Sequence, residues 1–193
     1  MSMSALTLTS ARLMRRLTRK LRRLARDKRG VSAVEFAMLL PLMVTLYLGG
    51  VEISQAVAID RKVTLISRTL ADLVAQVTSV AASDMTNIMA ASSAIIAPYN
   101  GNNLKITVSS VTIDGTGKAT IAWSKTQNGT ARTVGSTVTL PSALAVPNTS
   151  LIWGEASYAY TPTMGYVITG TLTLSDQIYM SPRLSTSVAC NAC

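Results

Sequence analysis

The hydrophobic pattern of the chain begins with an almost continuous apolar run over residues 31–51. Glu35 is the only charged residue in this run. At 1.5 Å per residue, a helix of this length spans about 31 Å, which matches the roughly 30 Å hydrocarbon core of a bilayer. The run therefore predicts one membrane-spanning helix over residues 31–52. A carboxylate inside hydrocarbon costs free energy, so Glu35 needs a partner or a function.

Beyond this run, apolar residues recur at spacings of three and four, which is the period of one helix face. They are Val63, Ile66, Leu70, Leu73, Val77 and Val80. The stripe covers fewer than three heptads, so it does not establish a coiled coil. We expect an amphipathic stem helix over residues 53–82 that packs on the protein's own sheet.

A second, shorter helix is predicted in the segment "SDMTNIMAASSAIIAPY", residues 83–99. Ser83 or Asp84 is placed to cap its N-terminus, because a short polar side chain there accepts a hydrogen bond from a free backbone N–H. Pro98 is placed to end it.

From Leu104 onward, apolar and polar positions alternate, which is the period of a strand. The alternation changes phase at residues 109–110, as a β-bulge would require. The turn sequence "DGTG" follows, and Ala119, Ile121 and Trp123 are expected on one face of the returning strand of a hairpin.

Three further strands are expected after a polar loop. A weaker one lies around residues 134–140, and the segments "LIWGEASYAY" and "YVITGTLTLSDQIYM" carry the other two. A helix followed by an antiparallel sheet predicts an α+β domain over residues 83–193.

The net charge of +9 is concentrated in residues 1–30, which hold ten of the 18 basic residues and one acid. By the positive-inside tendency, this leader stays in the cytoplasm and the chain after Glu52 lies outside. The leader also carries leucines at helical spacing, so a basic helix that binds nucleic acid or anionic lipid is the competing interpretation. Because a membrane span already explains basic flanking residues, we expect no nucleic acid partner.

A secretory signal peptide is a second alternative, since "AVA" at residues 56–58 resembles a signal peptidase site. The apolar run is long for a signal peptide, and the helical pattern continues through the supposed cleavage point. We therefore expect a span that continues into the stem.

The sequence is a poor match to an enzyme. It has no histidine, so histidine-based acid/base chemistry and histidine-ligated metal sites are absent. The one redox-like motif is "CNAC", Cys190 and Cys193, and no helix follows it that would lower a thiol pKa. In an oxidising compartment the pair is most simply a disulfide. We expect no catalytic residue, cofactor or metal.

The segment "RGVSAVEFAMLLPLMVTLYLGGVEISQ" resembles the N-terminal signature of TadE/TadG-like pilus assembly proteins, the minor pseudopilins of tight-adherence (Flp) pili. The sequence "EASYAYTPTMGY", the later "TLTLSDQIYMSPR" and the cysteine pair resemble the end of such proteins. The resemblance implies a pilin-like fold and a non-enzymatic role in the assembly of a type IV-like pilus. It also implies a single-pass protein of the bacterial inner membrane, with a cytoplasmic N-terminus and a periplasmic C-terminal domain. The implied partners are prepilin peptidase and other pilin, pseudopilin and pilus assembly subunits.

The resemblance further implies that prepilin peptidase cuts after Gly30, which makes Val31 the new N-terminus and places Glu35 and Phe36 fifth and sixth in the mature chain. The new amine of a neighbouring subunit can then pair with Glu35 as subunits pack. Whether the leader is cleaved stays open, because Gly30 could merely end the leader and Glu35 could reach the membrane interface. The alternative function is a membrane-tethered binding or adhesive β domain unrelated to pili.

Overall fold

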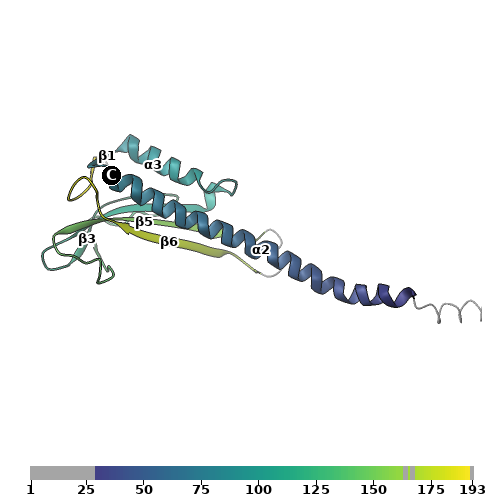
Figure 1. Ribbon diagram of the computed structural model, residues 1–193. Coiled ribbons are helices and arrows are strands. Elements are labelled where there is room, and N and C mark those ends of the chain that lie inside the picture. The colour runs from purple at the N-terminus through teal and green to yellow at the C-terminus, as the bar shows by residue number, and fades with distance from the viewer. Residues whose placement is uncertain (1–28, 163–164, 166–167, 192–193) are drawn as a thin grey trace, which may run out of the picture. The chain divides into compact units, whose positions relative to one another are not determined.

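The computed structural model describes residues 29–162, 165 and 168–191 (Figure 1). The chain divides into two compact units, Met1–Leu48 and Gly49–Cys193. Helix α2, Arg29–Ala75, supplies the described structure of the first unit and the first helix of the second. Pro41 lies inside this helix, and the hydroxyl of Thr45 donates to the Pro41 carbonyl oxygen at 2.8 Å.

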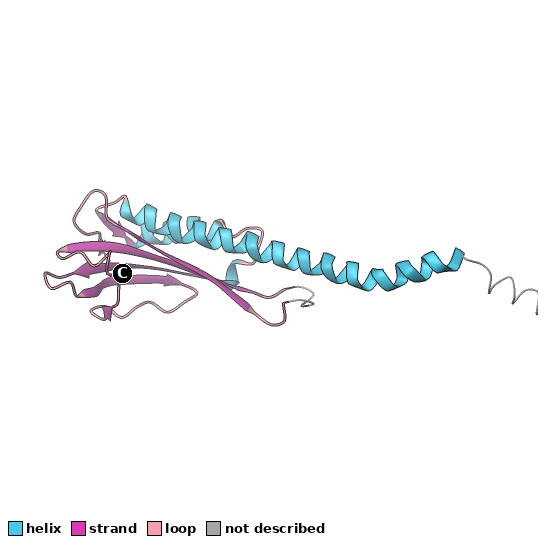
Figure 2. Cartoon of the chain, turned by 60° about the horizontal axis from the view of Figure 1, so that its bottom comes forward, coloured by secondary structure: helices cyan, strands magenta, loops and turns pink. Residues whose placement is uncertain are grey.

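The second unit is an α+β domain, which confirms the predicted fold class. In chain order, its remaining elements are β1 (Ser79–Ala81), α3 (Ala82–Ala94), the 3₁₀ turn η1 (Gly101–Asn103), β2 (Leu104–Ile113), β3 (Ala119–Gln127), β4 (Thr137–Val138), β5 (Thr149–Tyr160), β6 (Leu172–Met180) and β7 (Ala189–Asn191). Strands β4-β3-β2-β5-β6 form one antiparallel sheet in that order, and β1 pairs with β7 in parallel. The second half of α2 and helix α3 cover one face of the sheet (Figure 2). We call this face the helix side and the other face the open side.

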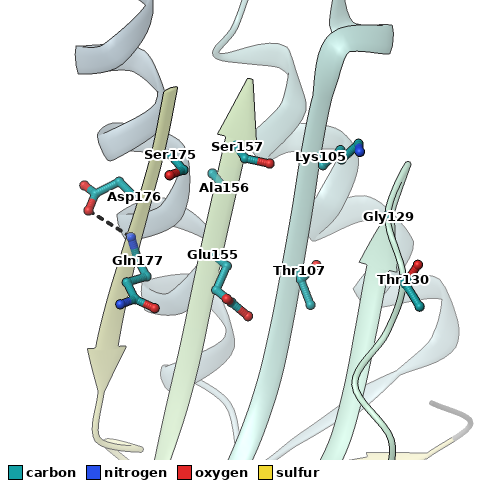
Figure 3. Close-up of a pocket in the computed structure, with 10 residues that line it drawn as sticks. All are labelled: Lys105, Thr107, Gly129, Thr130, Glu155, Ala156, Ser157, Ser175, Asp176 and Gln177. Atoms are coloured by element: carbon teal, nitrogen blue, oxygen red, sulfur yellow. Dashed lines mark hydrogen bonds between the residues drawn. The ribbon is translucent and has the colours of Figure 1, made fainter. Parts of the chain in front are cut away.

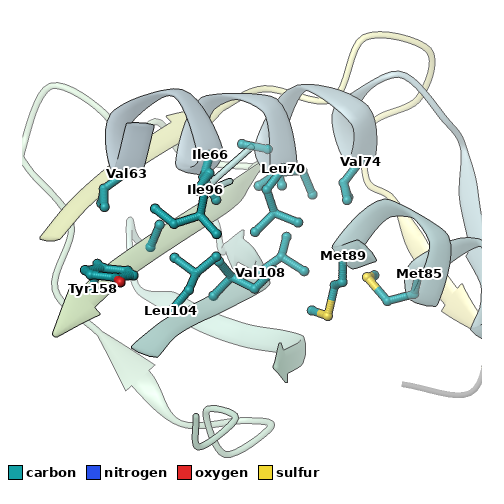
Figure 4. Packing of buried hydrophobic residues seen from close by; sticks show 14 of the residues in the cluster. Val63, Ile66, Leu70, Val74, Met85, Met89, Ile96, Leu104, Val108 and Tyr158 are labelled. Atoms are coloured by element: carbon teal, nitrogen blue, oxygen red, sulfur yellow. The ribbon is translucent and has the colours of Figure 1, made fainter. Parts of the chain in front are cut away.

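The main core lies between α2, α3 and the helix side of the sheet (Figure 4). Val63, Ile66 and Leu70 of α2 are fully buried there. Their stripe thus packs on the protein's own sheet, as the helical period predicted. Helix α2 ends at Ala75, so Val80 of the predicted stripe lies in β1, where it is buried as well.

Helix α3 runs from Ala82 to Ala94, so it begins and ends before the residues that the sequence predicted. Its N-cap residue is Ala81, which makes no side-chain cap, and Asp84 lies in the first turn. The predicted cap by Ser83 or Asp84 is therefore wrong, because β1 pairing continues to the residue before the helix. At the other end, the Lys62 ammonium of α2 donates to the carbonyl oxygens of Ile95 and Ala97, at 2.9 and 2.8 Å. These bonds tie the end of α3 to α2.

A β-bulge does lie in the first hairpin, but it is in β3. The register of β2 with β5 runs without interruption, whereas its register with β3 shifts between Ser110 and Val111. Ser110 is opposite Trp123 and Val111 is opposite Ile121, so Ala122 is the extra residue. The change of phase in β2 therefore marks apolar residues that move from the helix side to the open side.

The bulge also corrects the prediction that Ala119, Ile121 and Trp123 share one face. Trp123 packs in the main core, while Ala119 and Ile121 belong to a second cluster on the open side. An inserted residue reverses the alternation of side chains along a strand, which is the physical reason. The second cluster also contains Val111, Ile113, Leu151 and Trp153. Val138 of β4 and the loop residues Leu140 and Leu144 pack against it.

Helix α2 approaches the sheet closely at Gly154 of β5. A Cβ atom at this position would lie 2.7 Å from the Ser67 carbonyl oxygen and 3.0 Å from the Ala71 Cβ atom. The obstructing atoms are helix backbone and an alanine, which cannot rotate away. Only glycine allows this helix to lie on this strand at the observed distance.

We predict that Gly154→Ala destabilises the protein by about 1–3 kcal/mol, because α2 must move away from β5. Denaturant unfolding of the detergent-solubilised protein, followed by the fluorescence of Trp123 and Trp153, measures the change. Gly101→Ala is the matched control, since nothing lies within 4 Å of a Cβ atom there. Equal unfolding midpoints for the two variants would contradict the packing argument.

Candidate functional site

The four residues that the sequence singled out near the span lie in the first two turns of α2. Gly30 is in the first turn, and no atom lies within 4 Å of a Cβ atom built on it. Val31 and Glu35 are four residues apart, so they share one face of the helix. Glu35 is exposed, as are Val31 and Phe36 at 53% and 58%.

The segment around Glu35 exposes its large apolar side chains. Its highest-hydropathy window has a mean hydropathy of 1.9, and none of it is buried. The exposed side chains are those of Val31, Val34, Phe36, Met38, Leu39, Leu40, Leu42, Met43, Val44, Leu46 and Tyr47. Helix α2 is long and apolar enough to cross a membrane, so the chain fits a single-pass membrane protein.

Glu52, the next acidic residue along α2, is buried at 4% exposure. Its Oε2 atom accepts a hydrogen bond from the Ile168 N–H at 3.2 Å, and its carbonyl oxygen accepts one from the Tyr160 hydroxyl at 3.3 Å. Burial raises the pKa of Tyr160, and the nearby charge of Glu52 raises it further. Glu52 therefore helps to hold Tyr160, at the end of β5, and Ile168 on α2. The sequence pattern, which predicts only that the span ends at Glu52, did not indicate this role.

The C-terminal segment carrying Cys190 is held across one end of the domain. The Trp123 indole N–H donates to the Val188 carbonyl oxygen at 2.8 Å, and the Ser150 hydroxyl donates to that of Thr186 at 2.6 Å. Cys190 lies in β7, in register with Val80 of β1. Cys193 lies outside the described residues, so its pairing with Cys190 stays a prediction.

We predict that Cys190 and Cys193 form a disulfide in the native protein, because they lie three residues apart in a compartment expected to be oxidising. Alkylation of the native protein without reductant should label neither thiol. The same protein after reduction is the control and should be labelled at both. Labelling of both cysteines before reduction would show that the disulfide does not form.

A polar groove of about 570 Å³ lies on the open side of the sheet (Figure 3). Two rows of side chains cross strands β2, β5 and β6 and line it. One row is Lys105, Ser157 and Ser175, and the next is Thr107, Glu155 and Gln177. Residues 129–130 of the loop after β3 form its side. We call this depression the polar groove.

Arg132 connects the loop after β3 to the side chains beside the polar groove. Its guanidinium donates from Nε and Nη2 to the two carboxylate oxygens of Glu155, at 3.0 and 2.7 Å. The same group lies 3.7 Å from the ring centroid of Trp153, which stacks on Tyr179 at 5.2 Å. Burial raises the pKa of Tyr179, with Glu155 adding to the rise and Arg132 opposing it.

Sequence reasoning missed both the polar groove and the Arg132 cluster. Arg132 sits in a segment whose composition indicates only a loop, and Glu155 lies in a strand 23 residues away. The alternation of Glu155 with buried neighbours along β5 was the available signal, and Arg132 has none. Across the described residues, no three His, Cys, Asp or Glu side chains gather as a metal-binding group.

The comparison with known families covers nearly the whole of α2. A family model described as TadE-like protein matches residues 30–72, a span that begins at Gly30 and includes Glu35 and Phe36. No curated protein and no solved structure matches the chain. The match to the TadE-like family model over residues 30–72 is consistent with the TadE/TadG-like family that the sequence resembles.

Proposed function

We propose that the protein is a non-enzymatic minor pseudopilin, or assembly component, of a tight-adherence (Flp) pilus. The TadE-like family suggests involvement in Tad pilus assembly. The observation that carries the proposal is the exposed apolar segment of α2, in which Glu35 is the only charge before Glu52. A helix of this kind serves both to hold a subunit in a bilayer and to pack subunits together.

The two parts of α2 support different tasks under this proposal. From Ala56 to Ala75, the apolar stripe of the helix is buried against its own sheet. Between residues 31 and 48, the apolar side chains are exposed and can contact lipid or neighbouring subunits. The domain's core thus does not depend on the apolar side chains of the first segment.

Glu35 is the proposed assembly residue of the first segment. Its carboxylate would pair with the α-amino group of a neighbouring subunit's Val31, created by prepilin peptidase after Gly30. Attraction between opposite charges is strong where water is scarce, so the pair would set how far one helix slides along the next. In this arrangement the leader is cytoplasmic and the domain from Gly49 onward is periplasmic, anchored in the inner membrane.

Processing is the first test of this proposal. We expect mass spectrometry to find Val31 at the mature N-terminus. Gly30→Val should leave a longer precursor, because glycine gives a protease an accessible backbone that a β-branched residue restricts. Gly50→Val is the control, since this glycine is also helical and has open space around it. An intact N-terminus in cells that assemble normal pili would contradict cleavage, and a start at Ile59 would support a secretory signal peptide.

The second test separates assembly from simple anchoring. We expect Glu35→Leu to insert at least as well as the native chain, because the span becomes more apolar, yet to lose pilus assembly. Glu35→Gln should fail in the same way, since it keeps the shape and removes the charge. Pilus formation and co-purification with assembly subunits are measured at equal membrane abundance.

Ser32→Leu is the control for added hydrophobicity, because it changes an exposed position of the same segment without removing a charge. Wild-type assembly by Glu35→Leu would rule out the pairing mechanism. The second candidate function, a membrane-tethered binding domain whose span is only an anchor, would then take first place. The polar groove is the observation that favours it.

A further inference from the structure

Strand β6 forms an open edge of the five-stranded sheet. It pairs with β5 from Leu172 to Met180, and among the described residues no strand lies on its other side. The opposite edge of the sheet is β4, which is only two residues long. An edge strand presents a row of backbone N–H and C=O groups that can pair with a further strand. Strand β6 is therefore where this fold can accept one.

One hydrogen bond indicates which backbone groups of β6 point to the open edge. The Gln177 N–H donates to the carboxylate of its neighbour Asp176 at 2.8 Å, and Figure 3 shows this bond on the side of β6 away from β5. In an antiparallel ladder both backbone groups of a residue point the same way, and alternate residues point to opposite edges. Ser175, Gln177 and Tyr179 therefore direct their N–H and C=O groups outward.

The side chains of β6 on the helix side combine apolar groups with one charge. Leu174, Ile178 and Met180 are half-buried and pack against the main core. Asp176 lies on the same side, because it is in register with the core residue Ala156. Within the described part of the chain, the Asp176 carboxylate has no ion pair. The edge thus presents two apolar positions with a negative charge between them.

The central position of this charge argues against a second copy of the chain as the partner. Strand β6 covers residues 172–180, so full antiparallel pairing with its own copy would place Asp176 opposite Asp176. Because Asp176 directs its backbone groups to β5, this pair would be non-hydrogen-bonded, with Cα atoms only about 4.5 Å apart. Like charges directly opposite each other in a sheet are destabilising. An inward-facing charge also opposes pairing with an apolar strand.

A strand with a basic residue opposite Asp176 satisfies both groups of the edge. Its backbone carbonyl would accept the Gln177 N–H, which releases the Asp176 carboxylate to bind the ammonium or guanidinium group. Apolar side chains two residues before and after the basic residue would contact Leu174 and Ile178. A strand with an apolar or acidic residue there would displace water from the carboxylate and leave it unpaired.

We propose that the edge of β6 binds an extended segment of another protein, which runs antiparallel to β6 and places a lysine or arginine opposite Asp176. Main-chain hydrogen bonds supply the affinity, and Asp176 supplies the selectivity. The proposal does not depend on pilus assembly, because β6 lies outside the matched segment 30–72 and the binding is measured on the isolated protein.

The test is a fluorescence-anisotropy titration of labelled nine-residue peptides, the length of β6, with the full-length protein in detergent. The peptides alternate valine and threonine, and the central valine is kept or replaced by lysine or glutamate. We expect the lysine peptide to bind, and the other two to bind about tenfold more weakly, the size of one lost hydrogen bond to a charged group. Asp176→Lys should reverse the preference, so that the glutamate peptide binds best.

Ser175→Pro tests the backbone contribution. It removes an outward N–H and no bond to β5, so the fold should persist while binding of the lysine peptide is lost. Asp84→Lys is the matched charge control, because Asp84 is exposed in the first turn of α3, and it should keep the native preference. The unfolding midpoint of each variant, followed by tryptophan fluorescence, shows whether the fold is intact.

The proposal is overturned if the lysine peptide does not bind at up to about 1 mM, or binds no better than the other two peptides. Unchanged binding of this peptide by Ser175→Pro, or an unchanged preference in Asp176→Lys, would also contradict it. Sedimentation of the native protein and Ser175→Pro tests for a second copy at the edge. A dimer of the native protein that Ser175→Pro abolishes would show that the edge pairs with itself, against the proposal.

Discussion

Gly154 lets helix α2 lie so close to strand β5 that a methyl group there would meet the carbonyl oxygen of Ser67. This approach sets the depth at which the α2 stripe of Val63, Ile66 and Leu70 enters the core. Helix α3 is in turn tied to α2 through Lys62. Both helices therefore cover the same face of the sheet, and part of the other face stays free for the polar groove.

The two glutamates of α2 illustrate how one helix serves two environments. Glu35 is exposed among apolar side chains, whereas Glu52 is buried and binds the Ile168 N–H. A buried carboxylate persists when its charge is met by hydrogen bonds, so Glu52 is explained by the fold itself. The fold offers no such explanation for Glu35. This difference is why we propose a function in subunit pairing for Glu35 and not for Glu52.

The open side of the sheet is divided between an apolar and a polar half. The bulge at Ala122 of β3 places Ile121 on this side and Trp123 on the other, and the loop after β3 covers the apolar cluster around Ile121. Arg132 of that loop binds Glu155 and lies over Trp153, at the border between the two halves. The loop thus closes the apolar half and leaves the polar rows of β2, β5 and β6 accessible.

Local pattern was enough for much of this protein. The period of three and four predicted the stripe of α2, the alternation predicted β2, and the "RGVSAVEF" segment indicated a resemblance that the family model matches, because each depends on neighbours in sequence. Prediction from local pattern failed where a residue's position depends on a strand partner far away in the sequence. The side of the sheet that Trp123 occupies depends on an inserted residue in its pairing with β2, and the start of α3 depends on β1 pairing with a C-terminal strand. The polar groove likewise exists only because Lys105, Ser157 and Ser175, which are far apart in the chain, are aligned by strand register, and register is a property of the tertiary structure.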